Sequence, residues 1–393
     1  MTIRTLDVLG DVEGSRVFVR VDFNVPMRDG AVVDDSRIRA TLPTLLELLD
    51  RGATLVLGSH LGRPKGKVRD DLRLAPAGAR LAELLARPVT ATGQTTPEDL
   101  PDEDVILLEN LRFDPGEEAN DPVFAGRLAE YADAYVDDAF GAVHRAHASV
   151  SALPDLMLAS GRPAVAGRLL QREVEVLSTL LEEPGRPYVA ILGGAKVSDK
   201  LATINALVDR VDALLIGGAM AFTLIAAEGG GIGDSLVEPE RFDEVRDARA
   251  RATERGIPLL LPVDVVAAQE MSVDAARRTF PADRVPDGWK GLDIGPDTVR
   301  RFASTIADAK TILWNGPMGV FELEPFAAGT LGVAQAVAAS DAFSVVGGGD
   351  SLLAVRRIGL EDAFDHLSTG GGASLEFLEG RTLPGIAILE GAS

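Results

Sequence analysis

The stretch that decides the fold is Tyr188-Val-Ala-Ile-Leu192, followed directly by Gly193-Gly-Ala-Lys196 and Val197-Ser-Asp-Lys200. Its apolar run has the length of a buried strand, and the glycine pair after it indicates a turn into a helix. Strands that alternate with helices are typical of βαβ units in a parallel sheet. The pattern recurs through the second half of the chain, where we predict further strands at 213–216, 259–261, 312–314 and 343–346.

The first half repeats the pattern with different residues after each strand. Predicted strands at 17–21, 54–57, 105–108 and 134–136 are followed at once by charged or polar side chains. Helices are expected between them at 43–51, 74–86 and 124–132. Ligands of open parallel sheets bind outside the carboxyl ends of the strands. We therefore predict an anion site in the arginine-rich first half and a nucleotide site in the glycine-rich second half.

The predicted fold class is α/β, with two doubly wound, Rossmann-like parallel-sheet domains joined by a helix and hinge. A chain of 393 residues is too long for one ordinary hydrophobic core. Leucines and valines at helical spacing predict the connecting helix at 167–183, ended by Pro184-Gly185. We place the first domain at 1–167 and the second at 168–374.

The composition excludes several classes of function. Lys and Arg total 39 against 60 Asp and Glu, and this net charge of -21 argues against binding to nucleic acid or to an anionic membrane. Cysteine is absent, so disulfides and catalytic thiols are excluded. No apolar segment has the ~20 residues of a membrane span, and the N-terminus does not look like a secretory signal. We expect a cytoplasmic protein.

The candidate anion ligands of the first half are arginines and histidines. Each arginine alone could be an ordinary surface cation, but their gathering at predicted strand ends favours an anion site. The pair His144-x-x-His147 could bind zinc, yet no cysteine or further histidine lies nearby to complete such a site. These candidates are Arg37, Arg63, Arg112, Arg145, His60, His144 and His147.

The second half lacks a Walker A motif, so its glycine loops are the candidate nucleotide site. Lys196 and Lys200 are predicted on one helical face, where they could hold successive phosphates, although the motif by itself is more often a glycine turn followed by exposed lysines. Gly347-Gly-Gly-Asp350-Ser351 combines backbone donors with a carboxylate suited to Mg²⁺, although Asp350 could equally be a helix N-cap. The stretch 314–322 could enclose a base and ribose or be an ordinary loop, and 368–374 could be an anion nest or a hinge.

Taken together, these motifs resemble the phosphoglycerate kinase family. The resemblance is carried by Arg20-Val-Asp22-Phe-Asn24, Ser59-His60-Leu-Gly-Arg63, Leu111-Arg112-Phe113, and the stretches 138–147, 193–200, 314–322, 347–351 and 368–379. It implies reversible phosphoryl transfer from 1,3-bisphosphoglycerate to ADP, giving 3-phosphoglycerate and ATP in glycolysis. It also implies a monomer whose two lobes close on a hinge, with the segment 375–393 returning to the first domain.

The resemblance also implies roles for individual residues. The phosphoglycerate would be bound by Asp22, Phe23, Asn24, Arg37, His60, Leu61, Gly62, Arg63, Arg112 and Arg145. The nucleotide with Mg²⁺ would be bound by Gly194, Ala195, Lys196, Lys200, Gly291, Asn315, Glu322, Gly348, Gly349, Asp350 and Ser351, with Asp350 as the metal ligand. Arg37, Lys196 and Lys200 would be catalytic. The chain departs from the family pattern at Ala142, Val143 and Ala219, which affects local loop packing and removes no charged ligand.

This chemistry agrees with the residue types. Phosphoryl transfer depends on positioning and on neutralising charge, which lysine, arginine, Mg²⁺ and backbone N–H groups supply. A carboxylate acceptor is already ionised at neutral pH, so no general base is required. The alternative is a non-catalytic, hinge-closing binder of phosphorylated metabolites. Such a binder would have no use for the predicted metal and ribose ligands Asp350 and Glu322.

Overall fold

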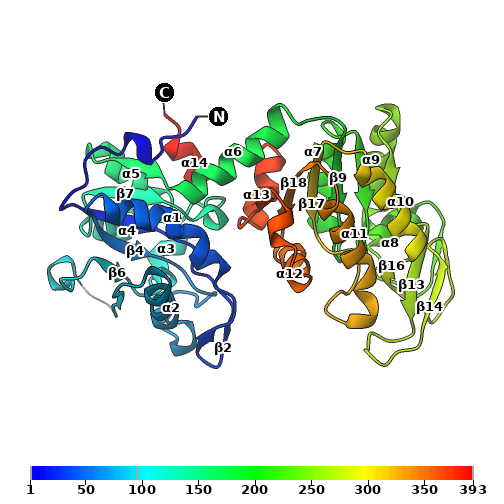
Figure 1. Ribbon diagram of the computed structural model, residues 1–393, viewed down its shortest axis with the longest axis horizontal. Coiled ribbons are helices and arrows are strands. Elements are labelled where there is room, and N and C mark those ends of the chain that lie inside the picture. Colours follow the sequence, from blue (N-terminus) through cyan, green and yellow to red (C-terminus); the bar gives the residue numbers. More distant parts are fainter. Residues whose placement is uncertain (1, 94–95, 392–393) are drawn as a thin grey trace. The chain divides into compact units, whose positions relative to one another are not determined.

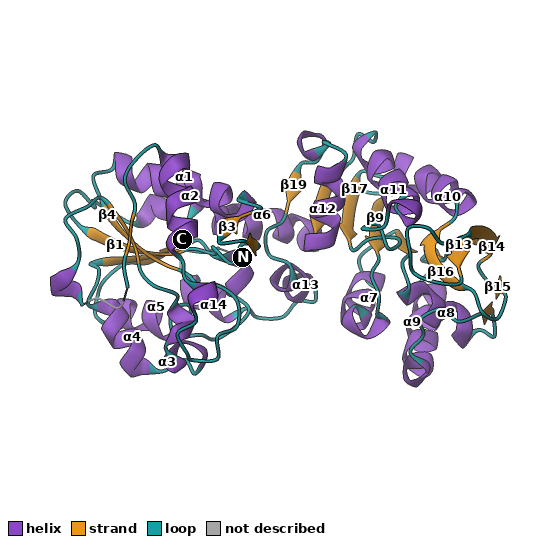
Figure 2. Ribbon diagram, turned by 90° about the horizontal axis from the view of Figure 1, so that it is seen from below, coloured by secondary structure: helices purple, strands orange, loops and turns teal. Residues whose placement is uncertain are grey.

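The computed structural model describes residues 2–93 and 96–391. The chain divides into two compact units, which we call unit 1 (Met1–Glu175 with Thr382–Ser393) and unit 2 (Val176–Arg381). Each unit contains a six-stranded parallel sheet with helices on both faces (Figures 1 and 2). The predicted α/β class is therefore confirmed. Among the described residues, no helix is both long enough and apolar enough to cross a membrane.

Unit 1 is built on a parallel sheet in the order β5-β6-β4-β1-β7-β8. Helices α1 and α2 cover one face, and α4, α5 and α14 cover the other (Figure 2). The strands are β1 (Arg16–Arg20), β4 (Thr54–Gly58), β5 (Thr90–Ala91), β6 (Val105–Leu107), β7 (Ala134–Asp137) and β8 (Ala164–Ala166), with a small hairpin of β2 (Met27–Arg28) and β3 (Ala31–Val32). The helices are α1 (Ser36–Asp50), α2 (Ala75–Leu85), α3 (Pro115–Glu118), α4 (Pro122–Ala129), α5 (Ala152–Ala159) and α14 (Pro384–Leu389).

Unit 2 has a parallel sheet in the order β12-β10-β9-β17-β18-β19. Its strands are β9 (Tyr188–Leu192), β10 (Ala213–Ile216), β12 (Leu259–Leu260), β17 (Thr311–Asn315), β18 (Phe343–Gly347) and β19 (His366–Leu367). Its helices are α7 (Leu201–Val208), α8 (Met220–Ala227), α9 (Phe242–Glu254), α10 (Pro296–Ala307), α11 (Ala328–Ala338), α12 (Gly349–Arg357) and α13 (Gly372–Leu378). Helices α7, α8 and α9 lie on one face of the sheet, and α10, α11 and α12 lie on the other (Figure 2).

Unit 2 also contains antiparallel strands that the sequence analysis did not predict. β13 (Asp264–Ala268) pairs with β14 (Arg277–Pro281) on one side and with β16 (Lys290–Ile294) on the other. A short pair joins β11 (Gly231–Ile232) to β15 (Arg284–Val285). Charged residues interrupt the apolar pattern of β14 and β16, which explains why neither strand stands out in the sequence.

The cores follow from the strand composition. In unit 1, Val17 and Val19 of β1 pack with Leu55 and Leu57 of β4, all 0% exposed, against the apolar face of α1. Every residue of β9 is buried, as expected for a strand covered by helices on both faces. Burial on both faces explains why these strands appear in the sequence as continuous apolar runs.

Helix α1 differs from its predicted bounds. A helix was expected to begin at Pro43, because proline is favoured in the first helical turn. Instead α1 begins at Ser36 and contains Pro43 in its interior. The side chains of Ile38, Leu45 and Leu48 on its inner face are all 0% exposed, so tertiary packing outweighs the backbone cost of the proline. The correction places Arg37 in the first turn of α1.

The two units are linked by α6 (Arg168–Glu182), and the division between them falls inside this helix. The returning segment begins at Thr382, later than the expected 375, because α13 stays in unit 2, where Thr203 Oγ1 donates to Glu379 Oε1 at 2.8 Å. Beyond it, α14 packs in unit 1, and Gly385 N donates to Val143 O at 2.9 Å. Val143 therefore supports the returning segment.

Candidate active site

The carboxyl end of β1 carries a buried carboxylate paired with an arginine. Asp22 is 6% exposed, and Arg37 Nη1 lies 2.6 Å from its Oδ2. Burial alone would raise the pKa of Asp22, but the charges of Arg37 and Arg20 lower it below its usual value. Asp22 therefore remains ionised and holds Arg37 at the strand ends.

Hydrogen bonds join the loop after β1 to the loop after β4. Phe23, which is buried, donates its N–H to Ser59 Oγ at 2.8 Å. Asn24 Oδ1 accepts from Gly62 N at 2.9 Å. Gly62 has φ +62°, a left-handed conformation that glycine adopts without strain. These bonds fix the loop that carries the predicted ligands His60 and Arg63.

Asn110 connects this loop to the one after β6. Its Oδ1 accepts from Leu61 N at 3.2 Å and from Arg112 N at 3.1 Å. Its Nδ2 donates to Leu61 O at 2.8 Å and to Leu72 O at 2.9 Å. Arg112 Nη1 adds a bond of 2.8 Å to Gly62 O. Asn110 was not predicted, because no charge marks it as a ligand in the sequence.

Arg112 is a buried cation with incomplete bonding. In the described part of the chain its Nε has no hydrogen-bond partner, and the nearest carboxylate, Glu118, is 3.6 Å away. Burial lowers the pKa of Arg112, and the charges of Arg20 and Arg145 lower it further. Buried polar atoms are normally bonded, so an underbonded guanidinium beside other cations indicates a place for an anion.

The structure brings most of the predicted basic side chains close enough to influence one another's pKa. We call this group, with Arg20, the cation cluster, and it contains Arg20, Arg37, Arg112, Arg145, His60 and His147. Burial and the charges of Arg112, Arg20 and Arg145 lower the pKa of His147 to about 4, so His147 is neutral at pH 7. Arg145 is exposed, and no acceptor for its guanidinium is found among residues 2–93 and 96–391. Arg63 is also exposed and lies in the loop that carries His60.

Arg20 belongs to this cluster but was not among the candidates predicted from the sequence, whereas His147 was. Arg20 is fully buried at the end of β1, and His147 is 7% exposed. Arg20 could have been suspected, because a charged residue interrupts the apolar run Val17-Phe-Val-Arg-Val21.

In unit 2, the glycine turns pack against each other. Gly193 N donates to Asn315 O at 3.0 Å, Gly194 N to Pro317 O at 3.1 Å, and Gly218 N to Met318 O at 3.1 Å. The structure thus corrects the expectation that these N–H groups point at phosphate oxygens. Gly193 is required for packing, since a Cβ on it would lie 2.1 Å from Pro317 O.

The N-terminus of α12 is the open backbone site of unit 2. Gly348 precedes the helix with φ +88°, and Gly349 and Asp350 are exposed. The N–H groups of Gly349, Asp350 and Ser351 have no acceptor in the described part of the chain, whereas Ser351 Oγ accepts from Gly316 N at 2.7 Å. Free N–H groups and the helix dipole favour an anion here.

Lys200 lies beside this helix end. Its Nζ donates to Asn315 Oδ1, and the Asn315 side chain also lies against Gly347 and Gly348. Burial lowers the pKa of Lys200 to about 8, while the charges of Asp199 and Asp350 oppose this shift. A half-buried ammonium next to free N–H groups is suited to a phosphate.

The two lysines do not share a helical face as predicted. Lys196 is exposed and extended, just before a 3-10 turn at Val197–Asp199, and Lys200 lies between that turn and α7. Glu238 holds this segment by accepting from Ser198 Oγ at 2.6 Å and from Ser198 N at 3.1 Å. Glu238 is 40 residues away in the chain and has no motif that could have identified it.

The remaining nucleotide candidates are spread over unit 2. Gly291 is buried in β16, where a Cβ would lie 2.0 Å from the ring of Phe222. Glu322 and Ala195 are exposed. Among the described residues, no group of three or more acidic, His or Cys side chains could hold a metal by itself. A single exposed carboxylate at Asp350 fits Mg²⁺, which usually keeps several waters and takes its other ligands from phosphates.

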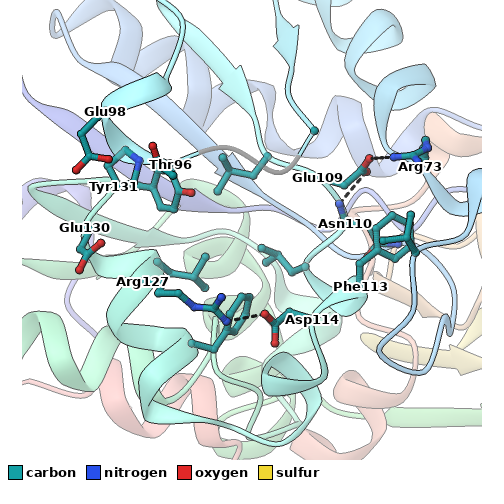
Figure 3. A pocket seen from close by; sticks show the side chains of 17 residues that line it. Arg73, Thr96, Glu98, Glu109, Asn110, Phe113, Asp114, Arg127, Glu130 and Tyr131 are labelled. Carbon is teal, nitrogen blue, oxygen red and sulfur yellow. Dashed lines mark hydrogen bonds and ion pairs between the residues drawn. The ribbon is translucent and has the colours of Figure 1, made fainter.

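Unit 1 also has a cavity of about 470 Å³ that was not predicted (Figure 3). Asn110 and Leu111 form part of its wall, with Phe124 and Leu128 of α4. Ion pairs line it, including Arg73 Nη1–Glu109 Oε2 at 2.8 Å and Arg127 Nη2–Asp114 Oδ2 at 2.6 Å. Because Asn110 also holds Leu61 and Arg112, this wall supports the loops of the anion site.

Comparisons with known proteins agree over nearly the whole chain. A model of the phosphoglycerate kinase family matches residues 6–381. The phosphoglycerate kinase of Salinispora tropica is 56% identical over 406 residues, which cover 99% of this chain and 100% of that protein. The one from Roseiflexus castenholzii is 51% identical, with 100% and 99% covered. The solved structure of phosphoglycerate kinase from Coxiella burnetii has 42% identity and a TM-score of 0.86, with 99% of each chain covered.

Proposed function

Because this chain belongs to the phosphoglycerate kinase family, we propose that it transfers a phosphoryl group between 1,3-bisphosphoglycerate and ADP, giving 3-phosphoglycerate and ATP. The observation that carries the assignment to particular residues is the cation cluster of unit 1, in which a buried and underbonded Arg112 lies among other positive groups. Glu118 and Glu117 offset part of this positive charge, but Arg112 Nε still has no hydrogen-bond partner among the described residues, which supports a phosphorylated acid as the ligand.

The acid is bound by unit 1 in this proposal. Arg63, Arg112 and Arg145 hold its distant phosphate, and His60 and Asn24 contact its carboxyl end. Asp22 orients Arg37 through the 2.6 Å ion pair, so that Arg37 faces the group that moves. The other predicted substrate residues, Phe23, Leu61 and Gly62, form the loops that position these side chains.

The nucleotide is bound by unit 2 in this proposal. The free N–H groups at Gly349 and Asp350 and the ammonium of Lys200 receive its phosphates, with Asn315 orienting Lys200. Gly291 lets β16 pack closely on Phe222 beside the base, and Glu322 accepts from its ribose. Asp350 is the residue that would hold Mg²⁺, which neutralises charge on the phosphates when it is bound. Gly194 and Ala195 form the turn that carries Lys196.

The reaction itself needs little covalent help from the protein. The carboxylate that accepts the phosphoryl group is ionised at neutral pH, so no general base is required. Arg37 and Lys200 stabilise the charge on the transferring group, and Lys196 assists them. Transfer requires the acid and the nucleotide to meet, so the expected hinge closure stays a prediction. We also propose that the enzyme acts as a cytoplasmic monomer.

One assay separates this function from a non-catalytic binder of phosphorylated metabolites. Wild-type protein is mixed with 1,3-bisphosphoglycerate and ADP, and ATP formation is followed by a coupled enzyme with and without Mg²⁺. We expect rapid ATP formation that depends on Mg²⁺. Binding of 3-phosphoglycerate without any ATP formation would instead support the binder.

A further inference from the structure

A series of buried hydrogen bonds in unit 1 joins Glu117 to His60 through Ser149 and Arg20. Glu117 accepts from Ser149 Oγ at 2.6 Å and from Ser149 N at 2.9 Å. Arg20 Nε lies 2.8 Å from Ser149 Oγ, and Tyr135 donates to Ser149 O at 2.8 Å. Glu117, Ser149 and Arg20 are each 0% exposed, so water does not compete for these bonds.

The chemistry of the groups fixes the direction of each bond. A hydroxyl has one proton, and Ser149 gives it to Glu117, because a carboxylate only accepts. Ser149 Oγ therefore accepts from Arg20. A guanidinium only donates, so in the 3.1 Å contact between Arg20 Nη2 and His60 Nδ1 the ring nitrogen is the acceptor.

An imidazole whose Nδ1 accepts a hydrogen bond and which is neutral carries its proton on Nε2. Within residues 2–93 and 96–391, no protein group bonds to His60 Nε2. We propose that Glu117, Ser149 and Arg20 hold His60 in this one tautomer, so that its Nε2–H donates a hydrogen bond to the bound phosphoglycerate. The donation to phosphoglycerate rests on the proposed function, whereas the tautomer is a property of the free protein.

The groups that face His60 keep its ring neutral. Burial lowers the pKa of His60 well below its usual value, and the charges of Arg20, Arg112 and Arg37 lower it further. Asp22 opposes them, but its Oδ1 is 3.9 Å from Nδ1, beyond hydrogen-bond distance. His60 thus acts as a donor whose charge does not change around pH 7.

Ser149 and Glu117 are positioning residues in this proposal, since they reach the ligand only through Arg20 and His60. Ser149→Ala removes the acceptor for Arg20 Nε, which leaves the bond from Arg20 Nη1 to Val21 O and weakens the alignment of the guanidinium with His60. We expect the KM for 3-phosphoglycerate to rise about tenfold, the loss of roughly one hydrogen bond. We expect kcat and the KM for ATP to stay within about twofold of the wild type. Glu117→Gln should raise the same KM by a smaller factor.

Ser160→Ala is the matched control. Ser160 Oγ also accepts from an arginine, Arg162 Nε at 2.9 Å, and donates to Met157 O at 2.9 Å. Ser160 is exposed and takes no part in the cluster around His60. This variant should leave all kinetic constants unchanged. Thermal unfolding of each variant shows whether it is folded under the conditions of the assay.

The direct measurement is a long-range proton–nitrogen correlation spectrum of the ¹⁵N-labelled full-length protein. The chain has only four histidines, and His60→Gln identifies the His60 signals by their loss. We expect an unprotonated Nδ1 and a protonated Nε2 from pH 6 to 8, a tautomer mixture in Ser149→Ala, and a shift of the Nε2–H signal on adding 3-phosphoglycerate.

Any one of three results would overturn the proposal. The first is a protonated Nδ1 in the wild type, and the second is a Ser149→Ala variant whose spectrum and KM are identical to those of the wild type. The third is an Nε2–H signal that does not shift when 3-phosphoglycerate is added. Failure of the proposed function has a different signature, because it appears as absent ATP formation by the wild-type enzyme and leaves the spectrum of the free protein unchanged.

Discussion

Arg37 Nη1 lies 2.6 Å from Asp22 Oδ2, although the two side chains come from different elements, the first turn of α1 and the loop after β1. Asp22 is buried and Arg37 is half-buried. The pair therefore fixes one guanidinium edge and leaves the other donors of Arg37 available. A cation held this way costs little reorganisation when charge develops beside it.

Arg37→Ala should lower kcat by about a hundredfold or more, because it removes a preorganised cation from the transferring group. The KM for ATP should change little, since Arg37 belongs to the site of the acid. The measurement is the coupled assay of ATP formation, fitted separately for kcat and KM. Arg39→Ala is the control, because Arg39 is exposed on the same helix and pairs with Asp35 at 2.9 Å. Unchanged turnover in Arg37→Ala contradicts this role.

Lys200 should give the reaction an alkaline limit. Burial lowers its pKa to about 8, so the free enzyme loses this positive charge as the pH rises through 8. The value of kcat/KM for ATP should therefore be highest below pH 8 and fall above it. Lys200→Arg should abolish this limb, because arginine stays protonated, although its different shape will lower the rate. If the decrease in kcat/KM for ATP above pH 8 persists unchanged in Lys200→Arg, a group other than Lys200 causes it.

The sequence predicted the strands and their carboxyl ends well, for a physical reason. A strand such as β9 is covered on both faces and must be a continuous apolar run, and the polar residue that follows marks its end. The function of a glycine was not predictable in the same way. Gly193 and Gly349 both follow strands, yet the first packs against Pro317 and the second is open.

Residues that act by positioning other side chains also could not be predicted from the sequence. Ser149 bonds to Arg20 across 129 positions of the chain, and Glu117 bonds to Ser149 across 32. Neither stands in a motif with a recognisable chemical role, and only the folded sheet brings them together. Arg112 was predicted from its charge, but its missing hydrogen-bond partner is visible only in the structure.

Asp293 should make the stability of unit 2 depend on pH. Burial raises its pKa to about 7 from 3.8, although bonds from Gly329 N and Ile294 N oppose the shift. Between about pH 4 and 7 the folded state then binds more protons than the unfolded state, so protonation of Asp293 stabilises the folded state. This stabilisation is complete below pH 4 and is lost as the pH rises to 7. Asp293→Asn should flatten the fall in the unfolding midpoint over this range.

Tryptophan fluorescence measures this effect in unit 2 alone, because both tryptophans of the chain, Trp289 and Trp314, lie there. We expect the change in midpoint between pH 5 and 8 to shrink by about 3 °C or more, on the usual scale of about 2–4 °C per kcal/mol. Asp341→Asn, at an exposed position, should keep the wild-type profile. If the unfolding midpoint changes equally with pH in the wild type and in Asp293→Asn, Asp293 is ionised in the folded state.

Gly291→Ala should impair the nucleotide site through packing alone. The added Cβ would lie 2.0 Å from the ring of Phe222, which is 3% exposed and cannot turn outward without opening a core. Overpacking of this kind costs about 1–3 kcal/mol, and the displaced β16 should raise the KM for ATP about tenfold while sparing the KM for 3-phosphoglycerate.

Gly126→Ala is the matched control, because Gly126 lies inside α4 with nothing within 4 Å of the added carbon. It should stabilise the protein by roughly 0.5–1 kcal/mol and leave both constants unchanged. If Gly291→Ala keeps the wild-type KM for ATP, Gly291 does not belong to the nucleotide site.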